Sequence, residues 1–66
     1  MIQKFTTKRD ANGNRYTLTI DHNKKRFYPD YNTTCDYSEY ITISKRDRDK
    51  LMEQAKTAGY SVAFKA

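Results

Sequence analysis

Cysteine is almost missing from this 66-residue chain, and its scarcity excludes a fold stapled by disulfides. Cys35 is the single cysteine, so no bridge can form within the chain, and a reducing, cytoplasmic setting is the simpler expectation. Long apolar runs are also missing. The longest, residues 62–64, is far below the roughly 18 residues of a membrane-spanning helix. We therefore expect a small soluble domain with no membrane partner.

Side chains that carry catalysis or hold metals are few. The chain has one histidine, His22, and two glycines, Gly13 and Gly59. It therefore lacks both a His/Cys cluster with metal spacing and a glycine-rich phosphate loop. His22 stands beside a predicted turn and is interpreted as a solvated turn residue, while Asp36 next to Cys35 disfavours a reactive thiolate. We expect no enzyme activity, no cofactor and no metal site.

The strongest local signal in the chain is the pair Asn12-Gly13. This pair is typical of a two-residue type I′ hairpin turn, in which both central residues need φ > 0. With these residues as the turn, Asp10 faces Arg15 and Phe5 faces Ile20. The first two strands of a hairpin are thereby predicted, with opposite charges facing each other near the turn.

A second turn continues the same pattern. With Asn23-Lys24 as a two-residue turn, Asp21 lies opposite Arg26 and Ile20 lies opposite Phe27. Because side chains alternate between the two faces of a strand, Phe27 then joins the apolar row begun by the first hairpin. The two turns together predict a three-stranded antiparallel β-meander.

The segment after the meander has no clear alternation. Pro29 is expected to end the third strand, because proline cannot donate a ladder hydrogen bond, and the turn-rich residues 29–38 are interpreted as a long loop. Loops of this length in a small domain often carry function. Residues 40–43 are β-branched and aromatic, which favours a short strand.

A helix with well-marked ends is predicted next. Ser44 with Asp47 three residues later is typical of a helix start, and Gly59 is typical of a left-handed helix stop. The helix is therefore expected over about 45–58. Residues 60–64 favour a C-terminal strand.

The predicted fold class is α+β, in a single small domain over residues 1–66. It consists of a three-stranded antiparallel β-meander, a short strand, one α-helix packed on the sheet, and a C-terminal strand. The predicted core is Phe5, Tyr16, Leu18, Ile20, Phe27, Ile41, Ile43, Leu51, Met52, Ala55, Val62 and Phe64. A core of about a dozen residues leaves little surplus over chain entropy. This favours a homodimer that covers a sheet edge or the uncovered sheet face.

Charge is unevenly distributed along the chain. The formal net charge is +5, which is the sum of +5 over residues 1–28, −3 over residues 29–44 and +3 over residues 45–66. A basic protein with a local acidic segment can attract a polyanion at one surface and repel it at another. Solubility alone also explains such a charge.

Tyrosine is the unusual residue, with six copies in the chain. Four of them lie in or beside the predicted loop, and tyrosine is enriched at protein interfaces because it offers large contact area at low entropic cost. The first hypothesis is therefore a small non-enzymatic protein that docks on a larger protein and modulates or inhibits it. Its predicted contact residues are Tyr28, Tyr31, Tyr37, Tyr40 and Asp36.

The composition gives this hypothesis a further context. The small size and the Lys/Asn/Thr/Tyr-rich composition resemble those of small bacteriophage or mobile-element gene products. This resemblance implies a target such as a host nucleic-acid-handling or defence factor.

The alternative hypothesis is a basic nucleic-acid-binding domain. Hairpin-turn and helix-start cations would contact phosphates, and they are Lys8, Arg9, Arg15, Lys24, Lys25, Arg26, Lys45, Arg46 and Arg48. Arg15 and Arg26, however, face carboxylates in the predicted ladder. We therefore place protein docking first and nucleic acid second.

Overall fold

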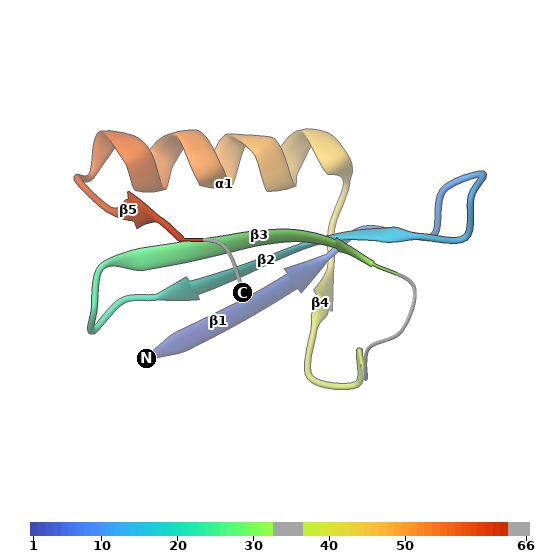
Figure 1. The fold of residues 1–66 in the computed structure, drawn as a ribbon, viewed down its shortest axis with the longest axis horizontal. Helices are drawn as coiled ribbons and strands as arrows, with labels where there is room; N and C mark the ends of the chain where they lie inside the picture. Colours follow the sequence, from blue (N-terminus) through green and yellow to red (C-terminus); the bar gives the residue numbers. More distant parts are fainter. Residues whose placement is uncertain (33–36, 64–66) are drawn as a thin grey trace.

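The computed structural model describes residues 1–32 and 37–63. Across these residues one helix lies on a five-stranded mixed sheet (Figure 1), which confirms the predicted α+β class. The sheet order is β4-β1-β2-β3-β5. The elements are β1 (Ile2–Thr6), β2 (Arg15–Asp21), β3 (Arg26–Asn32), β4 (Ile41–Thr42), α1 (Lys45–Thr57) and β5 (Ser61–Val62).

The first hairpin pairs β1 with β2 in a register two residues away from the predicted one. Phe5 pairs with Leu18 instead of Ile20. The reason is a longer turn: the N–H of Gly13 donates to the carbonyl of Asp10 at 3.0 Å, and the N–H of Asp10 donates to the carbonyl of Asn14 at 2.8 Å. Only Gly13 in this turn has positive φ, at 77°, as in a type I turn closed by a glycine bulge. A shift of two residues keeps every side chain on its predicted face.

The second hairpin has the predicted register. Asp21 pairs with Arg26, and Ile20 pairs with Phe27. The four residues between Asp21 and Arg26 form the turn, and Lys25 in this turn has a positive φ of 54°. The pairing of β2 with β3 was therefore predicted correctly. The turn, however, contains four residues and not the two predicted.

The prediction that Pro29 ends the third strand was wrong, because β3 continues to Asn32. The N–H of Ser61 donates to the carbonyl of Lys25, and the N–H of Ala63 donates to that of Phe27. Backbone groups at these alternate positions therefore point toward β5 and away from β2. Pro29 lies two residues beyond Phe27, so its missing N–H belongs to the outer edge and costs no bond to β2. The predicted loop thus begins after Asn32, and its residues 33–36 lie outside the described residues.

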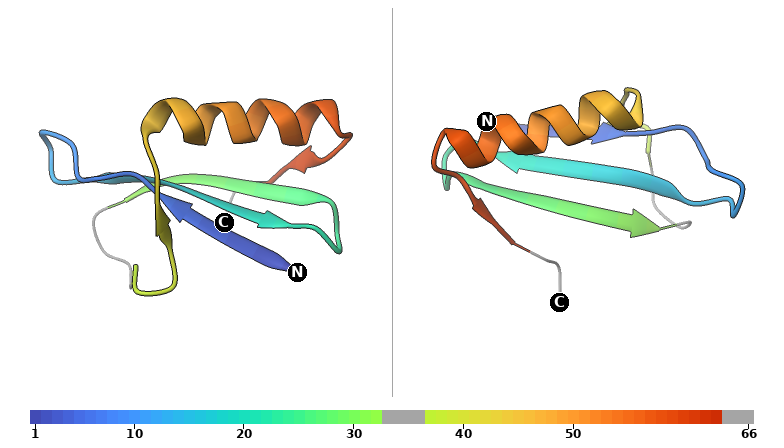
Figure 2. Two further views of the ribbon diagram at one scale, coloured as in Figure 1. Left: turned by 180° about the vertical axis from the view of Figure 1, so that it is seen from behind. Right: turned by 90° about the horizontal axis from the view of Figure 1, so that it is seen from above.

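The second half of the chain places its two short strands on opposite edges of the meander. β4 runs parallel to β1, and β5 runs parallel to β3, so α1 crosses over the sheet between them (Figure 2). The helix ends agree with the prediction to within one residue. The Ser44 hydroxyl accepts a hydrogen bond from the Asp47 N–H at 3.1 Å, and Gly59 has a φ of 87°, as a left-handed helix stop requires.

The core lies between α1 and the covered face of the sheet. Its buried apolar residues are Phe5, Leu18, Ile20, Phe27 and Ala55, with Ile43, Leu51, Met52 and Tyr60 packed against them. Two predicted core residues were wrong: Ile41 and Val62 are 59% and 47% exposed, because they stand on the two edge strands. Tyr16 is half-buried, and Phe64 lies outside the described residues. Among the described residues, no helix is both long and apolar enough to cross a membrane.

Candidate binding surfaces

Two tyrosines stack on each other where β2 meets the end of β3. Tyr16 pairs with Tyr31 across the strands, and their ring centroids lie 4.5 Å apart with 25° between the planes. The Tyr31 hydroxyl donates a hydrogen bond to the Asp10 carboxylate, while the residue stays 41% exposed. The Tyr31 side chain is therefore held by its hydroxyl and by one face of its ring, and it remains exposed to solvent.

Cations from the first turns of α1 pack beside the inner ring of this stack. Lys45 Nζ lies 5.2 Å and Arg48 Cζ 5.4 Å from the Tyr16 ring centroid, within the range of cation–π attraction. Both cations also contact Asp49, each at 3.0 Å. Hydrogen bonds from Lys45, and then from Arg48, lower the pKa of the Asp49 carboxyl. Arg48 is only 8% exposed, so it supports the stack and offers no surface charge.

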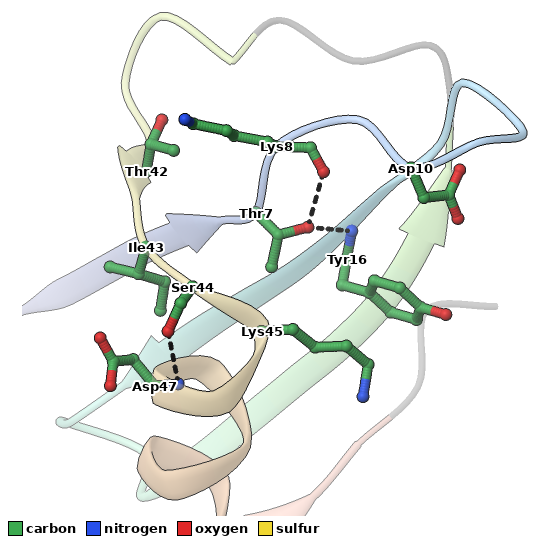
Figure 3. A pocket seen from close by; sticks show the side chains of 9 residues that line it. All are labelled: Thr7, Lys8, Asp10, Tyr16, Thr42, Ile43, Ser44, Lys45 and Asp47. Atoms are coloured by element: carbon green, nitrogen blue, oxygen red, sulfur yellow. Dashed lines mark hydrogen bonds between the residues drawn. The ribbon is translucent and has the colours of Figure 1, made fainter.

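A cleft of about 660 Å³ opens next to Tyr16 (Figure 3). It lies between the first hairpin, β4 and the start of α1, and it is lined by Thr7, Lys8, Asp10, Tyr16, Thr42, Ile43, Ser44, Lys45 and Asp47. We use the name tyrosine cleft for this cleft together with the stacked rings of Tyr16 and Tyr31 beside it. Its charges are mixed, with two lysines and two aspartates. The Tyr31 hydroxyl, followed by the Asn14 N–H, lowers the pKa of Asp10, so this carboxylate is ionised at neutral pH.

Two hydroxyl groups in the cleft are already engaged in structural bonds. Thr7 Oγ1 donates to the Lys8 carbonyl at 3.1 Å and accepts from the Tyr16 N–H at 3.1 Å. The Ser44 hydroxyl caps α1, as described above. These groups therefore fix the walls of the cleft.

The other predicted tyrosines lie on the opposite face of the sheet. The segment with Tyr37 and Tyr40 passes under the sheet, away from α1 (Figure 1). The two rings meet edge to face at 5.5 Å, with Arg15 Cζ 4.4 Å from the Tyr37 ring centroid and Lys4 Nζ 5.7 Å from that of Tyr40. Tyr28 is half-buried, and the strand alternation places it on the same face.

The predicted tyrosine surface is therefore divided between the two sheet faces. Tyr31 lies on the face that α1 covers, whereas Tyr28, Tyr37 and Tyr40 lie on the other. Asp36 lies outside the described residues. Tyr16 and Asp10, which hold Tyr31, were not predicted as site residues. Extending the register of the second hairpin through Pro29 would have paired Tyr16 with Tyr31.

Seven of the nine predicted nucleic-acid cations form two groups at opposite ends of a molecule 33 Å long; the other two are Arg15, which lies against the Tyr37 ring, and the buried Arg48. Lys8, Arg9, Lys45 and Arg46 lie near the first turn and the helix start, while Lys24, Lys25 and Arg26 lie at the second turn (Figure 1). Arg9 donates to the Gly13 carbonyl at 2.8 Å.

The ion pairs predicted in the strand ladder are not formed. Among the described residues, no salt bridge joins Arg15 to Asp10 or Arg26 to Asp21. Both carboxylates instead accept backbone N–H groups of their own turns. Arg26 is therefore not paired with Asp21, and this pairing no longer counts against a contact between Arg26 and a phosphate.

His22 is not the solvated turn residue that the sequence suggested. It is half-buried, with Nδ1 2.8 Å from the Tyr60 hydroxyl and Nε2 2.7 Å from Gln3 Oε1, because the register places it on the face under α1. Its ring thus joins β1 to the segment after α1.

The described residues contain no group of three or more His, Cys, Asp or Glu side chains that could hold a metal ion. No protein-family model, curated protein or solved structure matches this chain.

Proposed function

We propose that the protein is a non-catalytic docking module that binds a larger protein through the tyrosine cleft and thereby modulates it. The observation that carries the proposal is the placement of Tyr31. Its ring is exposed, yet its hydroxyl is bound by Asp10 and its inner face is stacked on Tyr16. An exposed aromatic side chain that is held so firmly suits an interface anchor.

Preorganisation gives this arrangement its energetic advantage. A free surface tyrosine loses rotamer freedom when a partner immobilises it, which costs about 0.5–1.5 kcal/mol. Tyr31 has already lost most of that freedom, because two contacts fix it in the folded chain. A partner would therefore gain the burial of the ring at a reduced entropic cost.

The surroundings of Tyr31 favour recognition over chemistry. The hydroxyl groups of Thr7 and Ser44 are engaged with the backbone, so they shape the cleft and are not poised as nucleophiles. Lys8 and Asp47 are exposed at the rim. Charges in such positions mainly affect orientation and association rate.

The test begins with the partner. The tagged protein is cross-linked in nuclease-treated lysate of the source cell, the captured protein is identified and purified, and its affinity is measured by calorimetry. Tyr31→Ala should weaken binding by about 2 kcal/mol, or roughly thirtyfold. Tyr31→Phe keeps the ring and its stacking on Tyr16 but loses the bond to Asp10, so it should lose part of the affinity, less than Tyr31→Ala loses. Tyr28→Ala, on the other sheet face, is the matched control and should bind within a factor of three.

Two results would reject the proposal. One is wild-type affinity in a folded Tyr31→Ala variant, with folding checked by circular dichroism. The other is an equal loss in Tyr28→Ala, which would place the interface on the other face of the sheet.

A further inference from the structure

The second turn contains an unusual backbone conformation at a charged residue. Three described residues have positive φ, and two of them are glycines; the third is Lys25, at 54°. A side chain in the left-handed region is crowded against its own backbone, and glycine or asparagine would be accommodated there more easily. A residue that is conformationally unfavourable, placed at an exposed tip, points to a use for its side chain.

The neighbours of Lys25 make the same turn strongly positive. Lys24, Lys25 and Arg26 are consecutive and exposed. The carboxylate nearest in sequence to Lys24 and Lys25 is that of Asp21, which is 9% exposed and accepts the N–H groups of Asn23 at 3.0 Å and Lys24 at 3.1 Å. The Asp21 carboxylate therefore accepts hydrogen bonds from the backbone of the turn, and it forms no salt bridge with Lys24, Lys25 or Arg26.

We propose that this turn binds the phosphodiester backbone of a nucleic acid, with Lys24, Lys25 and Arg26 contacting phosphates. The tip of a hairpin is convex, so a small anion would have few partners there. A polyanion can engage several cations at once and gain affinity by releasing its counterions. The turn lies at the end of the molecule away from the tyrosine cleft (Figure 2), so the two surfaces can be occupied together.

Fluorescence anisotropy with labelled random-sequence duplex and single-stranded 20-mers tests this proposal. Lys25→Gly removes the cation and relieves the backbone, so its melting temperature should equal or exceed that of the wild type. Its affinity near 50 mM salt should nevertheless fall roughly tenfold, and the log–log salt slope should flatten by about 0.9, as expected for one lost phosphate contact on duplex DNA.

Two further variants complete the design. Lys24→Gln removes a neighbouring cation at ordinary φ and should show a similar loss, which keeps the test valid if Lys25→Gly folds poorly. Lys50→Ala removes an exposed cation from α1, and its affinity should stay within a factor of two to three of the wild type.

The proposal is overturned if the wild type fails to bind either oligonucleotide at low salt and tens of micromolar protein. It is also overturned if both turn variants bind like the wild type, or if Lys50→Ala loses as much affinity as they do. Binding to vesicles that contain anionic lipid is measured as the last comparison. Binding to such vesicles that depends on Lys24 and Lys25, without oligonucleotide binding, would identify a membrane surface as the partner instead.

Discussion

The two hairpin turns of this protein solve the same geometric problem with different residues. Each begins with an aspartate whose Oδ1 accepts two backbone N–H groups of its turn: Asp10 in the first and Asp21 in the second. Each also has one residue at positive φ, Gly13 in the first turn and Lys25 in the second. The glycine meets the need of the backbone alone, whereas the lysine meets it at a conformational cost. The difference separates a structural turn from one that also presents a charge.

The turns also differ in how they connect to the rest of the fold. The second oxygen of Asp10 accepts the Tyr31 hydroxyl, so the first turn is linked to the exposed ring of the tyrosine cleft. Asp21 is buried among the strand ends, and both backbone N–H groups that it accepts belong to its own turn. The first turn therefore helps to hold a proposed anchor, and the second is a separate tip.

The largest effect is expected at Asp21. Asp21→Ala leaves the N–H groups of Asn23 and Lys24 without their acceptor in a partly buried turn, so the melting temperature should fall by roughly 5–10 °C. Asp21→Asn retains a carbonyl oxygen and should lose less than half as much. Thermal unfolding followed by circular dichroism measures both variants. Equal losses would mean that the charge of Asp21, and not its acceptor geometry, stabilises the turn.

A smaller loss is expected at Gly13. A Cβ built there meets no atom within 4 Å, so Gly13→Val should cost more than about 1 kcal/mol of unfolding free energy through its positive φ alone. Ala11→Val, in the same turn without positive φ, is the matched control and should be nearly neutral. Urea unfolding gives both values. An unchanged stability in Gly13→Val would contradict the assigned turn.

Local signals in the sequence were sufficient for much of the fold. The helix ends followed from Ser44 and Gly59, and the register of the second hairpin followed from matching Asp21 with Arg26. The first register was wrong because Asn-Gly fits both a two-residue turn and a longer turn with a glycine bulge. Sequence alone does not separate these two, since both keep the same side chains on the covered face.

The edges of the sheet and the tyrosine cleft were harder to predict, because both depend on contacts distant in sequence. The effect of Pro29 depends on whether its backbone faces β2 or the outer edge of β3, and the bonds that Lys25 and Phe27 accept from the segment of β5 show that it faces the outer edge. Ile41 and Val62 read as core residues because they are apolar, but edge strands leave them exposed. The bond from Tyr31 to Asp10 joins residues 21 positions apart, and no periodic pattern signals it.

The smallest effect expected concerns the link between Asp10 and Tyr31. The Tyr31 hydroxyl is the largest cause of the lowered pKa of Asp10, so Tyr31→Phe should raise that pKa toward its usual value of 3.8. A carboxyl whose pKa is lowered by folding stabilises the protein above its unfolded pKa, and this contribution is lost as the pH falls through its folded pKa. The protein loses stability in acid, and part of this loss comes from protonation of Asp10. In Tyr31→Phe that part should be smaller, at pH values below about 4.

Carbon-detected NMR titration of the aspartate carboxyls measures the pKa directly. Asp21, whose pKa is lowered mainly by the Lys24 N–H, is the internal control and should titrate unchanged. An unchanged pKa of Asp10 would show that its own turn, and not Tyr31, sets its ionisation, and the first turn would then resemble the second.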